Sequence, residues 1–267
     1  MANAEAEAAI IEAQTEIEIT DLHRRAMHRF VEEEANRQQN IETITDRALL
    51  LLTDQSDAEA IEDDWVTNFF DKSRIVSDNE MQDLWARVLA GEANSPGSYS
   101  RRTVNCLGDL DKTDAELFIK LCGFGWQIGN VVPLIFALDD DIYKSCDINF
   151  NSLSHLESIG LIQFGNLAGF KRRGLPQHLP IFYYGQPLLL KLPKDEGEND
   201  LELGKVLLTK IGQELAPICG GGPVDGFMDH VRKRWRDYLS IEASEQSPEQ
   251  ESTADADSNG GSSPPPC

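Results

Sequence analysis

The chain has 267 residues, of which 46 are acidic and 24 basic, so its net charge is −22 with neutral histidines. Hydrophobic residues make up 40% of the chain, which is enough for a packed core at this length and excludes a wholly disordered protein. No stretch approaches the roughly 18–20 consecutive apolar residues of a membrane helix. The acidic N-terminus also lacks the basic residues that begin a secretory signal. We therefore expect no membrane partner.

The cysteines indicate reduced thiols. They are five in number and scattered, and none is spaced as Cys-x-x-Cys (Cys106, Cys122, Cys146, Cys219 and Cys267). An odd set without such a pattern favours a reducing compartment over a disulfide framework or a zinc site. We therefore predict a cytoplasmic protein.

The negative charge is unevenly distributed. Residues 1–120 carry 26 acidic and 12 basic side chains, whereas residues 121–240 carry 14 and 12. The first half is therefore a poor phosphate binder, but the second half is nearly neutral. Residues 241–267 carry six acidic and no basic side chains and almost no apolar ones, so we predict a disordered acidic tail.

Residues 1–40 are predicted to form a helical arm. Residues 4–38 are rich in Ala, Glu, Gln and Arg and contain neither Pro nor Gly, a composition that favours a long helix. The apolar positions form a narrow stripe (Ile10, Ile17, Ile19, Leu22, Ala26 and Phe30). Such a stripe is typical of a helix that packs on a partner, although a solvent-exposed helix explains it equally well.

Residues 41–124 are predicted to form a bundle of helices with short connections. The first helix continues to Thr53. Three later helices are expected to begin at capping boxes, in which a Ser or Thr and a Glu three residues later satisfy free amides reciprocally (Ser56 and Glu59, Ser77 and Glu80, Thr113 and Glu116). Apolar residues recur behind each box at helical spacing.

Residues 125–219 are predicted to form an α+β module. A short helix over 151–159 is followed by Gly160, β-prone runs and then Thr209, a plausible N-cap for another helix. This order of elements resembles a winged helix-turn-helix. A break at Gly220–Gly222 precedes a terminal amphipathic helix over 224–240, which we expect to take part in self-association together with the arm.

The sequence contains no catalytic motif. The histidines are not spaced as metal ligands, and no nucleophile elbow, zinc-protease motif or phosphate loop is present. Asp139–Asp141 lacks the spacing of a calcium loop and is interpreted as solvated. We therefore predict no catalytic, metal or cofactor-binding residues and no enzyme, while a site assembled from distant residues stays open.

Two basic clusters make nucleic-acid binding an alternative. Lys171, Arg172 and Arg173 lie where the wing of a winged helix would be, and Arg232, Lys233 and Arg234 lie on the terminal helix. The helix over 151–159, which would read bases, contains no Arg or Lys. We therefore favour neutralisation of acidic surfaces, within the protein or in a partner, over DNA binding.

A polar patch is predicted after the helix that carries Leu84-Trp85-Ala86. It comprises Glu92, Ser98, Ser100, Arg101 and Arg102. The favoured interpretation is structural, with an ion pair between Glu92 and one of the arginines fixing the turn. The alternative is a recognition patch.

The segment from Ser77 to Glu92, SDNEMQDLWARVLAGE, resembles an uncharacterised bacterial family known as a domain of unknown function. The resemblance continues through Ser98, Ser100–Thr103 and the Leu107-x-x-Leu110-x-x-x-Asp114-Ala115 stretch. A looser likeness to a bacterial abortive-infection family implies a link to phage defence.

Together these patterns predict a mainly α (α+β) protein with a long N-terminal helix, a helical bundle, a small winged-helix-like module and a terminal helix. The predicted function is a non-enzymatic interaction or regulatory protein that binds a protein partner or itself. The alternatives are a winged-helix DNA-binding regulator and an effector enzyme with no visible motif.

Overall fold

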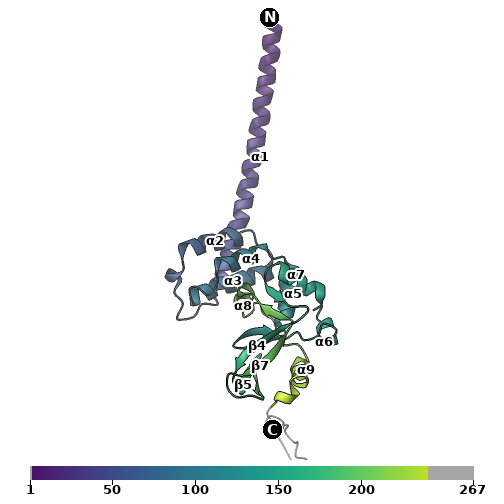
Figure 1. Ribbon diagram of the computed structural model, residues 1–267. Coiled ribbons are helices and arrows are strands. Elements are labelled where there is room, and N and C mark those ends of the chain that lie inside the picture. Colours follow the sequence, from purple (N-terminus) through teal and green to yellow (C-terminus); the bar gives the residue numbers. More distant parts are fainter. Residues whose placement is uncertain (1, 240–267) are drawn as a thin grey trace, which may run out of the picture.

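The computed structural model describes residues 2–239 and is mainly helical, with small antiparallel sheets (Figure 1). This confirms the mainly α (α+β) class and the long N-terminal helix. The acidic tail predicted over 241–267 lies outside the described residues.

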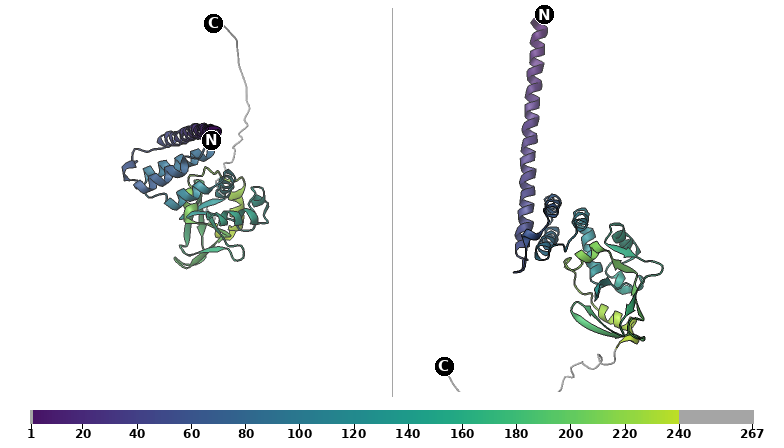
Figure 2. Two further views of the ribbon diagram at one scale, coloured as in Figure 1. Left: turned by 90° about the horizontal axis from the view of Figure 1, so that it is seen from above. Right: turned by 60° about the vertical axis from the view of Figure 1, so that its left-hand side comes forward.

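Helix α1 (Ala2–Leu49) is continuous and projects from the rest of the protein for most of its length (Figures 1 and 2). Its inner turns pack on α3, where Ile44 and Ala48 are buried. The predicted boundary at residue 40 therefore falls inside one helix. No Gly or Pro interrupts the segment, so nothing in the sequence stops the helix before Leu49. The prediction that it continues to Thr53 was wrong, because residues 50–53 form a turn and irregular chain.

Four further helices complete the helical part of the body: α2 (Asp63–Ser73), α3 (Asn79–Asn94), α4 (Arg101–Asp109) and α5 (Lys112–Cys122). Trp65 and Phe69 of α2 stack with ring centroids 5.1 Å apart, and the edge of Trp85 from α3 meets Phe69 at 5.0 Å. These rings are buried, so the apolar stripes expected from the helical spacing form the core between the helices.

The helix starts differ from the predicted capping boxes. Asp57, not Ser56, caps a short 3-10 turn (η1, Ala58–Ala60), and α2 begins only at Asp63. Asp78 rather than Ser77 caps α3, and Asp111 with Asp114 forms the box at α5. In each case a neighbouring aspartate replaces the predicted Ser or Thr, since its carboxylate accepts amide hydrogen bonds and also interacts favourably with the helix dipole.

Because Asp78 and not Ser77 caps α3, substitutions at these two positions should have different effects. Asp78→Ala removes the acceptor of the Glu80 and Met81 amides, which donate at 3.0 and 3.1 Å, and should lower the thermal unfolding midpoint by several degrees. Ser77→Ala should change the midpoint little. The Met81 hydrogen bond holds the pKa of Asp78 below its usual value, so the carboxylate stabilises α3 at neutral pH and loses that effect as the pH falls through its lowered pKa.

Thermal unfolding of both variants, followed by circular dichroism at neutral and acidic pH, tests this assignment. The difference between Asp78→Ala and the parent chain should shrink on acidification. Equal losses in the two variants at neutral pH would contradict it.

The second half of the protein combines strands and short helices. The hairpin of β1 (Gly125–Ile128) and β2 (Asn130–Pro133) joins β5 (His178–Tyr183) and β6 (Gln186–Lys191) in a sheet of order β2-β1-β5-β6. Strands β3 (Ile162–Phe164) and β8 (Val206–Leu208) pair, as do β4 (Phe170–Leu175) and β7 (Asn199–Gly204). Helices α6 (Asp141–Lys144), α7 (Phe150–Ser158), α8 (Lys210–Leu215) and α9 (Phe227–Arg234) and the 3-10 turn η2 (Arg236–Tyr238) complete the order.

Several local predictions in this half are confirmed. Helix α7 ends just before Gly160, whose φ of 86° suits glycine, and Thr209 caps α8 by accepting from the Gly212 amide. Pro133 lies in the edge strand β2, as expected for a residue that cannot donate to a ladder.

Candidate functional site

The outer part of α1 is a helix without a packing partner among the described residues. Every described side chain from Ile11 to Asn36 is exposed. Ion pairs between successive turns support the helix by itself, with Arg24 at 2.8 Å from Asp21 and Arg37 at 3.2 Å from Glu34. Each such pair contributes only about 0.3–0.5 kcal/mol in a solvated helix. The remaining apolar residues of this segment are therefore available to another surface.

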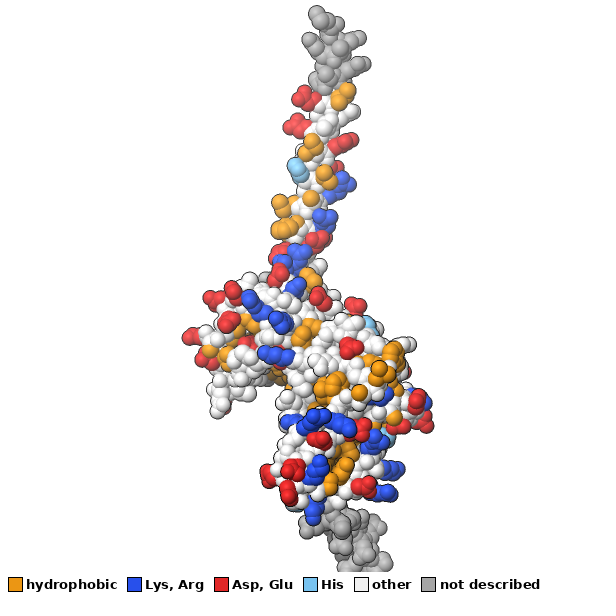
Figure 3. Space-filling model, in the orientation of Figure 1, with side chains coloured by type: hydrophobic (Ala, Val, Ile, Leu, Met, Phe, Trp, Pro, Cys, Tyr) orange, Lys and Arg blue, Asp and Glu red, His pale blue; other side chains and the backbone are white. Residues whose placement is uncertain are grey.

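These apolar residues form a stripe along one side of the helix. Ile11 is 63% exposed, Leu22 57% and Phe30 57%, and Figure 3 shows hydrophobic side chains following the projecting helix. Together with Thr15, Ile19 and Ala26 they occupy positions separated by three or four residues. At 100° per residue, this spacing keeps all six within one side of the helix. We call these six residues the arm stripe. Of the stripe predicted from the sequence, the side chains of Ile10 and Ile17 lie outside the described residues.

The predicted polar patch is brought together, but most of it holds a turn. The buried carboxylate of Glu92 accepts hydrogen bonds from the Gly97 amide at 2.6 Å and the Tyr99 amide at 2.8 Å. Ser98 donates to the carbonyl of Ser95, and Ser100 caps α4. The predicted ion pair between Glu92 and an arginine was wrong, because both carboxylate oxygens are used by backbone amides.

Arg101 and Arg102 are the exposed members of this patch. Arg101 lies 3.5 Å from Asp64, whereas no ion pair to Arg102 is found within residues 2–239. Both line a hollow of 630 Å³, which is also lined by Trp65 and Lys210. Three cations thus surround this hollow, while its buried acid, Glu92, is fully hydrogen-bonded to the turn.

Sequence reasoning missed Glu214, which joins this turn to the second half of the protein. Its carboxylate accepts from the Ser100 amide at 2.9 Å and from the Thr103 hydroxyl at 2.5 Å. Glu214 lies on α8, more than 100 residues away in the chain, so no local spacing could have identified the contact. Both hydrogen bonds are accepted by one oxygen of Glu214, and the other oxygen lies 3.7 Å from Lys210.

The first basic cluster does not present three free cations. The side chain of Arg172 turns inward and donates to the carbonyl of Ile128. Lys171 and Arg173 are exposed on β4, and Lys171 lies opposite Glu202 of the neighbouring strand β7. One of the three cations, Arg172, is thus used within the protein.

The second basic cluster lies near the first. Arg234 of α9 pairs with Glu202 at 3.3 Å and lies over the ring of Phe136. Arg232 lies 3.6 Å from Asp229, and Lys233 is exposed. Glu202 therefore connects the two clusters, as expected if they neutralise the protein's own acidic surface.

The apolar face of α9 is covered by the chain itself. Phe227 is fully buried with its ring 4.8 Å from that of Phe124, and Trp235 meets Trp126 at 6.3 Å. The part of this helix in self-association stays a prediction, and its apolar core side chains are packed within the chain. The apolar side chains of the arm stripe, in contrast, are exposed.

The described side chains include no group of three or more His, Cys, Asp and Glu residues placed to hold a metal ion. The described helices include none that is both long enough and apolar enough to cross a lipid bilayer.

Comparisons with known proteins identify a family but not an activity. The model of a family described as "Protein of unknown function (DUF2806)" matches residues 24–232. No curated protein and no solved structure matches the chain.

Proposed function

The chain belongs to DUF2806, a family of proteins of unknown function, and from its geometry we propose that it is a non-enzymatic interaction protein. It pairs with a second copy of itself through α1. The likeness to abortive-infection proteins extends this proposal to a cytoplasmic role in phage defence. The observation that carries the proposal is the symmetry of the arm stripe.

The arm stripe reads the same in both directions along the helix. Its positions are 11, 15, 19, 22, 26 and 30, so that each position n has a counterpart at 41 − n. When two copies lie antiparallel, Ile11 faces Phe30, Thr15 faces Ala26 and Ile19 faces Leu22. A twofold axis between residues 20 and 21 then maps the stripe onto itself, which is the requirement for a closed dimer.

The charges of the arm favour the same antiparallel arrangement. Glu12, Glu16 and Glu18 lie in the outer half of the stripe region, and Arg24, Arg25 and Arg29 lie in the inner half. Antiparallel pairing places these acidic and basic segments at the same level, whereas a parallel pair in register would place like charges together.

One interchain ion pair is specific enough to test. Glu18 and Arg25 are seven residues apart and therefore lie on the same flank of the stripe. Antiparallel packing brings matching flanks together, and residue 25 of one copy then lies within two residues of the level of Glu18 in the other. We expect these two side chains to pair in the dimer.

The shape of the protein leaves room for this pairing. The projecting part of α1 is free of the body in Figure 1 and in the right-hand view of Figure 2. In an antiparallel pair the two bodies lie at opposite ends of the paired arms, so they do not compete for the same space.

The test compares matched substitutions in the full chain by light scattering over a concentration series. The parent chain should approach the mass of a dimer, and Leu22→Glu should remain a monomer because it buries a charge in the interface. Val31→Glu is the control, since Val31 is also exposed but lies two and a half helical turns from Leu22, on the opposite side. It should leave the dimer intact.

A charge exchange then tests the orientation. Glu18→Arg alone and Arg25→Glu alone should each weaken the dimer severalfold, and the double variant should restore it. A parent chain that stays monomeric at every concentration would overturn the proposal, and a dimer without restoration in the double variant would overturn the antiparallel register.

A DNA-binding regulator is the alternative function. It is supported by the exposed Lys171, Arg173 and Lys233, and weakened by the internal contacts of Arg172 and Arg234. Retention of random duplex DNA at low salt, lost on neutralising Lys171, Arg172 and Arg173, would favour this alternative over a role confined to protein contacts.

A further inference from the structure

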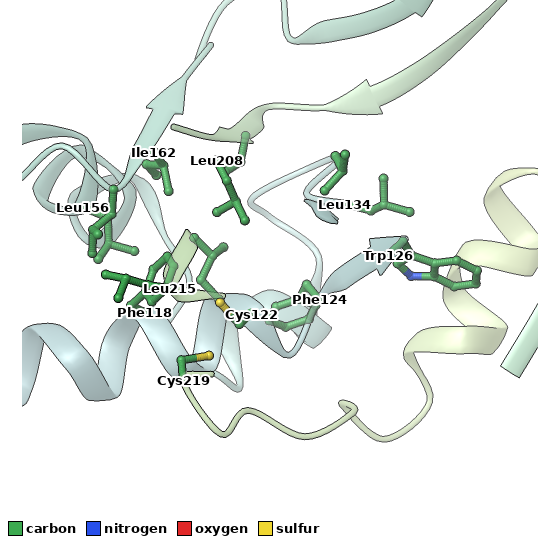
Figure 4. Packing of buried hydrophobic residues seen from close by; sticks show 14 of the residues in the cluster. Phe118, Cys122, Phe124, Trp126, Leu134, Leu156, Ile162, Leu208, Leu215 and Cys219 are labelled. Atoms are coloured by element: carbon green, nitrogen blue, oxygen red, sulfur yellow. The ribbon is translucent and has the colours of Figure 1, made fainter. Parts of the chain in front are cut away.

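Two cysteines from distant parts of the chain meet beneath the surface. Cys122 is the last residue of α5, and Cys219 follows α8 in the segment that leads to Gly220–Gly222. Figure 4 shows their sulfur atoms near each other, and the Cys219 thiol donates to the carbonyl of Ala216 at 3.2 Å. Both residues are buried, at 4% and 8% exposure.

Each member of this pair lines a different surface hollow. Cys122 borders a hollow of 270 Å³ together with Tyr184, and Cys219 borders one of 220 Å³ together with Arg87. Gly220 lines both, so the glycine segment forms the wall between them. A reagent the size of a hydroperoxide can therefore reach the pair from outside.

The glycine segment and Arg87 lie directly against the two cysteines. A side chain at Gly221 would meet the Cβ of Cys122 at 3.5 Å and the carbonyl oxygen of Ile119 at 3.1 Å, so the segment lies directly on the end of α5. Arg87 donates to the Ile218 carbonyl at 2.8 Å, which fixes its guanidinium beside Cys219.

We propose that Cys122 and Cys219 form a dithiol that hydrogen peroxide oxidises to an intramolecular disulfide, tying the segment after α8 to the end of α5. In the first step the Cys219 sulfur attacks one peroxide oxygen; the O–O bond breaks, and hydroxide leaves and becomes water by taking up the proton of the Cys219 thiol. Cys219 is then a sulfenic acid. The Cys122 sulfur attacks it, the S–S bond forms, and the S–O bond breaks with release of a second water. One peroxide is reduced and two thiols are oxidised.

The environment of the pair explains which sulfur attacks first. The neighbouring Cys122 thiol lowers the pKa of Cys219, and the charge of Arg87 adds to this effect against the opposing effect of burial. The neighbouring Cys219 thiol and burial both raise the pKa of Cys122. Cys219 is thus the nucleophile and Cys122 the resolving thiol.

Peptide mass mapping of the reduced full chain, treated with one equivalent of hydrogen peroxide and then alkylated, tests the proposal. The expected product is a linked pair of peptides containing Cys122 and Cys219, two hydrogens lighter than the reduced pair. Cys106→Ser and Cys146→Ser are the controls and should leave this product unchanged.

Two substitutions separate the roles of the thiols. Cys219→Ser should abolish the linked peptides, and Cys122→Ser should instead accumulate sulfenic acid at Cys219, trapped by dimedone. Circular dichroism checks that both variants fold. The absence of a Cys122–Cys219 link in the parent chain, while other thiols become oxidised, would overturn the proposal without recourse to any variant.

Discussion

Replacing Glu92 with alanine is expected to lower the free energy of unfolding by about 1–3 kcal/mol, because it leaves the buried amide of Tyr99 and the partly buried amide of Gly97 without their acceptor. The Gly97 and Tyr99 amides donate to the two oxygens of this carboxylate, which is only 4% exposed. The carbonyl of Tyr99 in turn accepts from the Trp65 indole at 2.7 Å, so loss of the turn also disturbs α2.

Denaturant unfolding of two matched variants measures this effect. Glu92→Gln keeps one acceptor oxygen and should lose less stability than Glu92→Ala. Glu116→Ala removes an exposed carboxylate on α5 and should stay within about 0.5 kcal/mol of the parent. A Glu92→Ala variant as stable as Glu116→Ala would show that the turn does not depend on this carboxylate.

Truncating Phe227 to alanine should cost about 3–5 kcal/mol of unfolding free energy, the usual range for a fully buried phenylalanine. Its ring packs edge-on against Phe124 at 4.8 Å and lies 5.6 Å from Tyr183 and 6.1 Å from Tyr143. These three rings come from different elements of the chain, so the substitution opens a cavity that no single element can close.

The matched control is Phe150→Ala, since Phe150 is 51% exposed at the start of α7. This variant should lose about 1 kcal/mol or less. Comparable losses at positions 150 and 227, measured by urea unfolding, would mean that α9 is not part of the common core.

The helices could be predicted because their apolar spacing is regular, as at Trp65, Phe69 and Trp85. Their exact starts could not, because an aspartate within two residues of each Ser or Thr competes for the same amides, and spacing does not rank the two. Strand β7 could not be predicted either, since Asp200 and Glu202 alternate with buried Leu201 and Leu203 in a short run beside other acids.

Among the candidate functional features, those set by local spacing could be predicted and those formed by distant segments could not. An apolar stripe on the arm could be predicted because helical spacing is local, and four of its predicted members belong to the arm stripe (Ile19, Leu22, Ala26 and Phe30). The contacts of Glu214, the inward turn of Arg172 and the meeting of Cys122 with Cys219 each join segments more than 40 residues apart. Such contacts depend on how the whole chain packs, which spacing within one segment does not determine.

Helix α1 continues without a break outward from its buried inner turns. The rotation of its outer part about the helix axis, relative to the body, therefore depends on the number of residues between them. Inserting a single residue between positions 31 and 36 would extend it by only about 1.5 Å but rotate everything beyond by about 100°. Two linked molecules would then face each other at a new dihedral angle. The number of residues in this helix thus fixes the mutual orientation of whatever its two ends carry.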